Sequence, residues 1–345
     1  AGEYRSKDYN LRPMEYRTLG KTDLRVSALG FGCGAVGGLL VKGERSEMTR
    51  AVARAIESGV NYFDTAASYG DGVSEENLGR ILTELRANVI VGTKTRLRFS
   101  DLDVIEPAIV ASVDDSLRRL GRAQIDLIQL HTSVALARRP ERQWLGPADF
   151  DAAMAAFSKL RAQGKVRHWG FTGTGESAAL HQAITGNVQA VQCPYNLLNP
   201  TAGFTTPRGF PFQDYGQLID RAAENNVGVI AIRILAGGAL SGSTARHPHA
   251  MQQVDPIGTS KTLAEDAALA GRFGFLVDEG HAASLVEAAI RFAMSKRGIS
   301  TALIGVATLE QLETALAAAD KGPLSAEALA RLGAVWAGFS GNAWQ

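Results

Sequence analysis

Eight short apolar runs, each followed by a segment of helical periodicity, constrain the fold of this chain more than any other feature. Each run has the length of a strand and ends in polar or glycine residues. Several are apolar nearly throughout, as parallel strands covered on both faces are. The predicted strands span residues 29–32, 60–64, 89–94, 125–131, 166–172, 190–195, 228–232 and 302–306. The predicted helices span residues 47–58, 74–86, 106–120, 149–163, 176–185, 215–225, 284–297 and 308–319. These units predict an α/β fold, a closed (β/α)8 or TIM barrel, rather than an open doubly wound sheet.

Segments at the two ends of the chain add to this barrel. Two short alternating runs at 16–19 and 24–27 flank a glycine-containing turn and predict an N-terminal β-hairpin. Residues 325–339 have the pattern of an extra C-terminal helix. We expect a single barrel domain over residues 14–345, preceded by a polar N-terminal extension at residues 1–13 that resembles no secretory signal.

Two long segments without clear periodicity, 132–147 and 237–278, follow predicted strands. Loops that follow barrel strands lie on the C-terminal face, where barrel enzymes carry their chemistry. Trp144, in the first of these loops, is a candidate wall of a substrate pocket. Functional residues are therefore expected at the strand ends and in these two loops.

The composition excludes several classes of protein. Of 345 residues, 46% are hydrophobic and 21% are charged, which is near the globular average and argues against a disordered or fibrous chain. The formal net charge of +1 gives no field that would attract nucleic acid or a membrane. Two cysteines, Cys33 and Cys193, are too few for a disulfide scaffold, and no apolar run reaches the roughly 18 residues that span a bilayer. We expect a cytoplasmic protein without a metal, and we leave self-association into a homo-oligomer open.

Polar side chains end three adjacent predicted strands. Asp64, Lys94 and His131 end the second, third and fourth predicted strands. Tyr69 follows Asp64 by five residues. Because the C-terminal ends of barrel strands meet on one face, we expect these four side chains to converge.

Together these four residues have a coherent chemistry for carbonyl reduction. Tyr69 would donate a proton to a carbonyl oxygen as hydride reaches its carbon. A phenol with a pKa of about 10 is a poor acid–base catalyst at neutral pH, but the Lys94 ammonium would lower that pKa. Asp64 would neutralise and fix Lys94, and His131 would hydrogen-bond the substrate oxygen or tune the tyrosine.

The sequence around these residues resembles the aldo-keto reductase family, and in particular its bacterial-type members with a long loop after the seventh strand. The resemblance covers nearly all of residues 14–320. Its motifs are Tyr16-Arg17-Thr18-Leu19-Gly20, Asn61-Tyr62-Phe63-Asp64-Thr65-Ala66, Ser68-Tyr69-Gly70, Gly92-Thr93-Lys94, Ser116-Leu117-Arg118-Arg119-Leu120, Leu130-His131, Gly164-Lys165-Val166-Arg167 and Val191-Gln192 with Tyr195-Asn196. It implies that Asp64, Tyr69, Lys94 and His131 form a catalytic tetrad with Tyr69 as general acid/base. It also implies that NADP(H), or less often NAD(H), binds in an extended pose without a Rossmann domain.

The resemblance implies further cofactor contacts. Gln192 matches the glutamine that binds the nicotinamide carboxamide, and Thr172 keeps a hydroxyl where the family often has serine followed by asparagine. Arg233 follows Ile232, which stands where family members usually carry an aromatic that stacks on the nicotinamide. Arg233 would bring a charge near the nicotinamide ring or the phosphates. The other implied contacts lie in the glycine-rich loop after the seventh strand and beside the first and eighth strands: Gly32, Leu235, Gly237, Gly238, Leu240, Gly242, Gly305, Thr308 and Gln311.

The loop after the eighth strand departs from the family. No cation lies between Gly305 and Ala315, where the family often carries lysine or arginine for the 2′-phosphate of NADP. A 2′-phosphate without a cationic partner loses charge-assisted hydrogen bonds of roughly 1.5–3 kcal/mol each. The choice between NADP(H) and NAD(H) therefore stays open.

Three functions remain open on the sequence alone. The leading one is an NAD(P)(H)-dependent oxidoreductase that interconverts an alcohol and a carbonyl compound, whether aldehyde, ketone or sugar. The second is a nicotinamide-binding regulatory subunit, because some relatives of this fold serve as channel-associated subunits. The third is a redox-neutral barrel enzyme that uses the same pocket, such as an aldolase with Lys94 as a Schiff-base amine.

Overall fold

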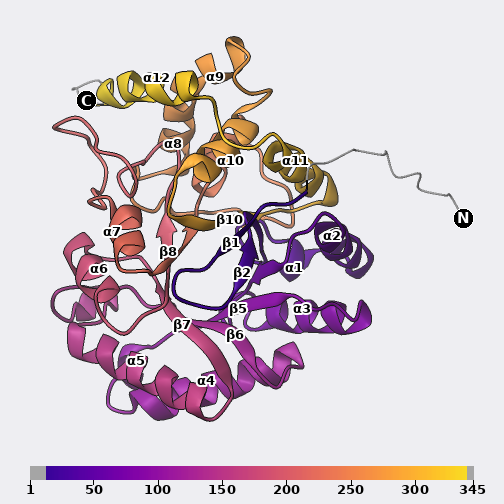
Figure 1. Ribbon diagram of the computed structural model, residues 1–345, viewed down its shortest axis with the longest axis vertical. Coiled ribbons are helices and arrows are strands. Elements are labelled where there is room, and N and C mark those ends of the chain that lie inside the picture. Colours follow the sequence, from indigo (N-terminus) through magenta and orange to yellow (C-terminus); the bar gives the residue numbers. More distant parts are fainter. Residues whose placement is uncertain (1–12, 340–345) are drawn as a thin grey trace, which may run out of the picture.

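Eight parallel strands close into a barrel in the computed structural model of the chain, which describes residues 13–339 (Figure 1). The strands are β3 (Leu29–Gly32), β4 (Tyr62–Asp64), β5 (Ile90–Thr95), β6 (Ile125–Leu130), β7 (Val166–Thr172), β8 (Ala190–Pro194), β9 (Gly228–Ile232) and β10 (Ile299–Gly305). Each strand pairs with the next, and β10 closes the ring by pairing with both β9 and β3. The predicted (β/α)8 barrel is confirmed.

The last strand begins earlier than the sequence predicts. β10 starts at Ile299, before the predicted start at Ala302. The prediction began too late because polar Ser300 and Thr301 interrupt the apolar run. In the structure the Ser300 hydroxyl donates a hydrogen bond to the carbonyl oxygen of Thr18 at 3.0 Å. A tertiary contact with the N-terminal segment thus compensates a polar residue that the strand pattern disfavours.

Helices surround the barrel (Figure 1). They are α1 (Leu39–Lys42), α2 (Arg45–Glu57), α3 (Val73–Glu84), α4 (Ile105–Leu120), α5 (Pro147–Ala162), α6 (Ser177–Ile184), α7 (Leu218–Glu224), α8 (Leu263–Ala270), α9 (Phe275–Asp278), α10 (Leu285–Ser295), α11 (Leu309–Asp320) and α12 (Ala326–Ala337). The eight predicted helices correspond to α2–α7, α10 and α11, and α12 is the predicted extra helix. Helix α7 begins later than predicted because Gln217, just before it, has a left-handed backbone with φ 56°.

The predicted β-hairpin closes the N-terminal end of the barrel. It consists of β1 (Tyr16–Thr18) and β2 (Arg25–Ser27). Its apolar side chains join side chains inside the barrel in one buried cluster, which we call the lower interior layer: Leu19, Leu24, Val26, Tyr62, Leu127, Ala190, Ile230 and Leu303. Gly20 in the turn has φ 54°, and an added Cβ would lie 2.1 Å from the backbone nitrogen of Gly228. The hairpin therefore approaches the barrel this closely only with glycine at position 20.

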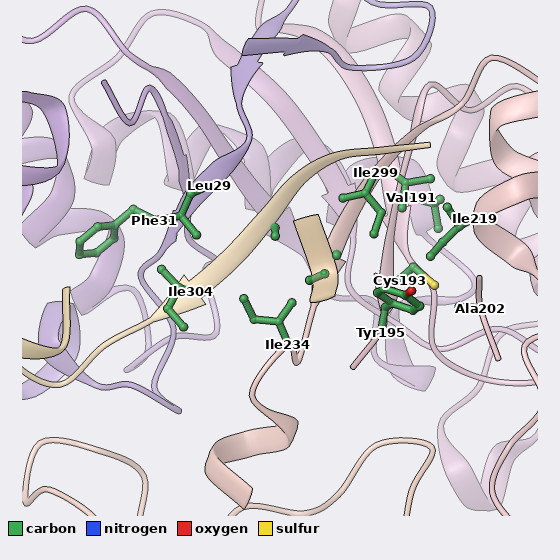
Figure 2. Close-up of a cluster of buried hydrophobic side chains, with 14 of the residues drawn as sticks. Leu29, Phe31, Val191, Cys193, Tyr195, Ala202, Ile219, Ile234, Ile299 and Ile304 are labelled. Atoms are coloured by element: carbon green, nitrogen blue, oxygen red, sulfur yellow. The ribbon is translucent and has the colours of Figure 1, made fainter. Parts of the chain in front are cut away.

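The main hydrophobic core lies between the strands and the helices. Figure 2 shows part of it, where Cys193 of β8 and Ile219 of α7 lie near Tyr195. Both cysteines, Cys33 and Cys193, are buried and unpaired, and burial raises the pKa of each thiol. They act as small core side chains rather than as reactive thiols.

The long segment after β9 is more ordered than the sequence predicts. The region 237–278 contains α8, α9 and two short 3-10 turns instead of being irregular throughout. Thr262 caps α8 by accepting a hydrogen bond from the backbone N–H of Glu265 at 3.2 Å, and the Glu265 side chain bonds back to the N–H of Thr262 at 3.0 Å. This capping box is visible in the sequence and was the signal for the missed helix.

The described part of the chain, residues 13–339, contains no helix with both the length and the apolar character that crossing a membrane would require. The expected N-terminal extension lies outside the described residues, except for Pro13.

Candidate active site

Three of the four predicted tetrad residues form one hydrogen-bonded group at the C-terminal ends of β4 and β5. The ammonium of Lys94 donates to Asp64 Oδ1, to the backbone oxygen of Thr65 at 2.7 Å and to the Tyr69 hydroxyl at 3.2 Å. An ammonium has three N–H donors, so this arrangement uses all of them. Lys94 and Asp64 are 1% and 3% exposed, which makes this a buried ion pair.

The chain places Tyr69 beside Lys94 through a tight turn after β4. The Tyr69 N–H bonds to the carbonyl of Ala66 at 3.0 Å, and Gly70 then turns the chain toward α3 with φ 61°. The ring of Tyr69 lies over Gly34 in the loop after β3, where an added Cβ would sit 3.4 Å from the ring. Tyr69 is thus held between two loops with its hydroxyl at the ammonium.

Burial and charge act in opposite directions on the ion pair. Burial by itself lowers the pKa of Lys94, but the charge of Asp64, together with the interaction with Tyr69, outweighs it, so the pKa of Lys94 lies above its ordinary value. Burial raises the pKa of Asp64, and the Lys94 charge together with hydrogen bonds from Tyr62 and Gln129 opposes that rise. Lys94 therefore remains an ammonium throughout the neutral range.

The pKa of Tyr69 differs from the sequence-based expectation. Burial raises the pKa of Tyr69 above its ordinary value, and the Lys94 charge opposes this rise without overcoming it. The expected contribution of Lys94 is present, but the expected net lowering is wrong, because sequence reasoning counted the charge and not the desolvation. The phenol is accordingly protonated at neutral pH.

His131 lies beside Tyr69 without a hydrogen bond to it among the described atoms. The two rings meet edge to face with centroids 5.9 Å apart, and His131 Nδ1 lies 3.4 Å from the Ser68 hydroxyl. Burial, reinforced by the charges of Lys94 and Arg96, lowers the pKa of His131 to about 3. The imidazole is therefore neutral at pH 7 and has one donor and one acceptor nitrogen.

The structure places Gln192 against Asp64. Its amide donates to Asp64 Oδ2 at 2.7 Å, so this amide bonds to a member of the predicted tetrad. Thr172 is the neighbour of Gln192 in the β7–β8 ladder, and its hydroxyl is buried with no hydrogen-bond partner in the described structure. A buried hydroxyl without a partner is costly, which makes Thr172 a suitable contact for a polar ligand.

Two further side chains at Asp64 were missed in the sequence. The Tyr62 hydroxyl and the Gln129 amide each donate to Asp64 Oδ2 at 3.2 Å. Each lies two residues before a predicted tetrad residue, Asp64 or His131, and alternate residues of a strand share a face. This alternation was the available signal.

The glycine-rich loop after β9 turns sharply beside two arginines. Gly237 and Gly238 have φ 70° and 113°, and Arg233 just before them also has a left-handed backbone with φ 57°. Arg233 Nη1 donates to the backbone oxygen of Asp255 at 3.1 Å. Arg246, which sequence reasoning missed, donates to the backbone oxygens of Gly237 at 2.7 Å and Val36 at 3.0 Å. Burial lowers the pKa of both arginines, and neither forms an ion pair with a carboxylate among the described residues.

The remaining predicted cofactor positions have mixed surroundings. The Thr308 hydroxyl caps α11 by accepting from the N–H of Gln311 at 3.2 Å, and Gln311 Oε1 accepts from Ala307 at 2.8 Å. Leu240 is fully buried in the hydrophobic core, and Leu235 packs against that core. Gly242 has φ 77° and ends the glycine-rich loop, while Gly32 and Gly305 pair across β3 and β10.

Trp144 lines a cavity, although that cavity is not lined by the tetrad. Its volume is about 550 Å³, and it lies among the loops that follow β6, β7 and β8. The lining is mostly charged or polar: Arg139, Glu141, Arg142, Trp144, Gly175, Glu176, Ser177, Gln213 and Asp214. Among residues 13–339 no group of three or more His, Cys, Asp or Glu side chains has a geometry that would hold a metal ion.

Comparison with known proteins agrees with this fold. L-galactose dehydrogenase from Arabidopsis thaliana is 26% identical over 315 residues, covering 88% of each chain. L-glyceraldehyde 3-phosphate reductase from Escherichia coli strain K12 is 28% identical over 367 residues, covering 96% of this chain and 95% of the relative. The solved structure of the aldo-keto reductase AKR11C1 from Bacillus halodurans in its holo form matches with a TM-score of 0.67 and 24% identity, over 96% of this chain and 97% of the other. The sequence profile of the aldo/keto reductase family matches residues 28–337, a span that includes every barrel strand, and so the chain belongs to this family of oxidoreductases.

Proposed function

We propose that the protein is an NAD(P)(H)-dependent oxidoreductase that interconverts a carbonyl and an alcohol, with Tyr69 as general acid in reduction and general base in oxidation. The observation that carries this proposal is the contact between Lys94 and the Tyr69 hydroxyl. Lys94 donates a hydrogen bond to the phenol oxygen, so the phenol's own O–H is left to donate to another acceptor. A substrate carbonyl oxygen is that acceptor.

The tetrad supplies the proton and stabilises the charge that develops on oxygen. As the carbonyl oxygen becomes an alkoxide, Tyr69 transfers its proton to it, and the resulting phenolate is stabilised by the neighbouring ammonium of Lys94. Asp64 holds Lys94 in position and keeps it charged. Neutral His131 donates a hydrogen bond to the same substrate oxygen.

The residues present fit a nicotinamide dinucleotide, which when bound supplies or accepts the hydride. The unpartnered Thr172 hydroxyl and the adjacent Gln192 amide suit the carboxamide group. Gly237 and Gly238 have no side chains to keep an anionic ligand from their backbone, and Arg233 and Arg246 place two positive charges beside them. This pairing of a glycine turn with cations suits the phosphates. The proposal covers both NAD(H) and NADP(H).

For the substrate we propose a small carbonyl or sugar-like compound. The names of the two relatives above give L-galactose and L-glyceraldehyde 3-phosphate, both of which carry hydroxyl groups beside a carbonyl carbon. One of these relatives is named as a dehydrogenase and the other as a reductase, so they support the chemistry and not its direction.

The geometry disfavours Lys94 as a Schiff-base amine. A lysine nucleophile attacks as the neutral amine and needs a lowered pKa. Here the pKa of Lys94 is raised, and all three of its N–H groups are bonded to protein oxygens. No specific observation favours a protein that binds nicotinamide only for regulation. All four predicted tetrad residues are present, which favours an enzyme.

Replacing Tyr69 by phenylalanine tests the proposal. We expect carbonyl reduction to fall by about 100- to 10,000-fold, the usual contribution of a positioned acid, while cofactor affinity is retained. The measurement is turnover of a carbonyl panel with NADH and with NADPH, with cofactor binding followed by fluorescence. Full carbonyl-reductase activity in Tyr69→Phe would contradict the proposed role of Tyr69. Failure of the unmodified protein to turn over any member of the panel, in either direction, would contradict the proposed function.

A further inference from the structure

We propose that Tyr62 is a positioning residue of the active site: together with Gln129 it holds the Asp64 carboxylate from inside the barrel, so that Asp64 stays ionised and remains the negative partner of Lys94. The inference concerns the Asp64–Lys94 pair itself, and its consequence for catalysis rests on the proposed function.

The Asp64 carboxylate has separate partners on its two oxygens. Oδ1 accepts from Lys94. Oδ2 accepts from Tyr62 at 3.2 Å, Gln129 at 3.2 Å and Gln192 at 2.7 Å. We call these three residues the Asp64 donor set. Its members are neutral and come from three different strands, β4, β6 and β8.

This donor set compensates the burial of a charge. Asp64 is 3% exposed, so bulk water contributes little to its solvation. An ionised carboxylate in such a place remains ionised only if hydrogen bonds and a counter-charge replace that water. Lys94 supplies the counter-charge at one oxygen, and the donor set supplies the hydrogen bonds at the other.

Two glycines, Gly92 and Gly30, leave space inside the barrel for the Tyr62 phenol. Tyr62 is fully buried, and its ring belongs to the lower interior layer. A Cβ added to Gly92 on β5 would lie 2.4 Å from the Tyr62 hydroxyl oxygen, and one added to Gly30 would lie 3.1 Å from the ring. Burial raises the pKa of Tyr62 well above its ordinary value, so it acts only as a neutral donor. A phenylalanine would fill the same space, so Tyr62→Phe removes the hydroxyl and keeps the packing of the ring.

Removing the Tyr62 hydroxyl has a predictable electrostatic consequence. With fewer donors the carboxylate is less stable, so Asp64 binds a proton more readily and its pKa rises. Lys94 loses its counter-charge once Asp64 is protonated, so in the variant the ion pair is lost at a higher pH. The other titratable and charged groups that act on these residues stay in place in the variant: Cys33, His131 and Arg233 near Tyr69 and Lys94, and Asp126 near Tyr62.

The chain offers a matched control. Tyr195, like Tyr62, is fully buried, but its hydroxyl has no hydrogen-bond partner in the described structure. Tyr195 lies in the main hydrophobic core between the strands and the helices (Figure 2), where its ring stacks on Phe292 with centroids 4.8 Å apart. Tyr195→Phe therefore removes a buried phenol oxygen that touches neither Asp64 nor Lys94.

The experiment measures the pKa of Asp64 directly by NMR titration of protein labelled with ¹³C at aspartate Cγ. The Asp64 signal is assigned by its absence in Asp64→Asn. We expect the pKa of Asp64 to be higher by about 0.5 or more in Tyr62→Phe, and unchanged in Tyr195→Phe. Gln129→Leu removes a donor from a different strand and should shift the pKa in the same direction, so it decides the question if Tyr62→Phe does not fold.

A second readout is the acid end of the pH profile of carbonyl reduction with saturating cofactor, where Asp64 becomes protonated. This acid limb should move to higher pH in Tyr62→Phe and not in Tyr195→Phe. An Asp64 pKa that is unchanged in both Tyr62→Phe and Gln129→Leu would overturn the inference. If the unmodified protein shows no turnover, the proposed function fails, but the NMR titration still decides the role of Tyr62.

Discussion

The barrel interior has two layers of opposite character built by the same strands. At the hairpin end, the lower interior layer is apolar. One alternation step further along the strands, the buried side chains are polar or charged: Asp64, Lys94, Gln129 and Gln192. Tyr62 and Asp64 show the change within a single strand, since they are two residues apart and share a face.

The two layers tolerate change to different degrees. Contacts in the apolar layer are non-directional, so a smaller side chain costs burial and leaves a cavity. Contacts in the polar layer are directional, and the loss of one partner leaves a buried charge or donor unsatisfied. The comparison assigns stability to one end of the interior and chemistry to the other, and this division is open to test.

The strongest test breaks the polar layer at its centre. Lys94→Met leaves the Asp64 carboxylate buried without a cation, and we expect a loss of about 3–5 kcal/mol in the free energy of unfolding, together with a loss of turnover. Urea denaturation and carbonyl reduction measure the two effects. Adding Asp64→Asn should recover stability and not turnover, whereas an equally stable single variant would show that the pair is not structurally coupled.

The apolar layer should respond in stability alone. Leu24 of the hairpin is 2% exposed, and Leu24→Ala should lower the free energy of unfolding by about 2–5 kcal/mol. Because Leu24 lies among the barrel's apolar residues and not at the tetrad, kcat and KM below the melting temperature should stay unchanged. A large change in kcat without a change in stability would contradict the division of roles.

The pH dependence sharpens the account of the polar layer. Reduction requires protonated Tyr69, whose pKa is raised mainly by burial, so the rate of reduction should be constant through neutral pH and fall as pH rises through that elevated pKa. Oxidation requires the phenolate and should rise toward the same alkaline range. His131 has a pKa of about 3 and should add no step near pH 6.5. Profiles of kcat/KM in both directions, from about pH 5 to about pH 11.5, check these expectations. A step near neutral pH would contradict the assignment of His131 as neutral.

The smallest effect is expected at the rim of the hairpin. Asp23 accepts from His168 Nε2 at 2.6 Å and from Arg167 at 2.9 Å, but its side chain is 68% exposed, so Asp23→Ala should cost at most about 1 kcal/mol. The hydrogen bond with His168 is the main cause that lowers the pKa of Asp23, with Arg167 contributing. Its contribution is therefore present above the pKa of the unfolded state and is lost as pH falls through the lower folded pKa. Thermal unfolding of the unmodified protein and of Asp23→Ala, measured against pH, should show that their difference in stability disappears in acid.

The sequence predicted the elements and the convergence of the tetrad far better than the contacts inside it. Strand periodicity and the order of strand ends are local signals, and they correctly brought Asp64, Lys94 and Tyr69 together. The Gln192–Asp64 bond and the contacts of Arg246 join segments distant in the sequence, and they depend on side-chain conformations that no pattern records. The predicted lowering of the Tyr69 pKa was wrong for a related reason: the phenol is desolvated only once the tertiary structure surrounds it.

The donor set around Asp64 also bears on when the site comes into existence during synthesis. Its strands are not contiguous in the sequence: Tyr62 and Asp64 belong to β4, Gln129 to β6 and Gln192 to β8. A nascent chain that has left the ribosome only as far as β6 already contains Asp64, Tyr69, Lys94 and Gln129. It still lacks Gln192, whose bond to Asp64 is the shortest in the donor set. The complete arrangement is thus a property of the nearly finished barrel, and a truncated half of this protein would carry the tetrad's residues without their assembled environment.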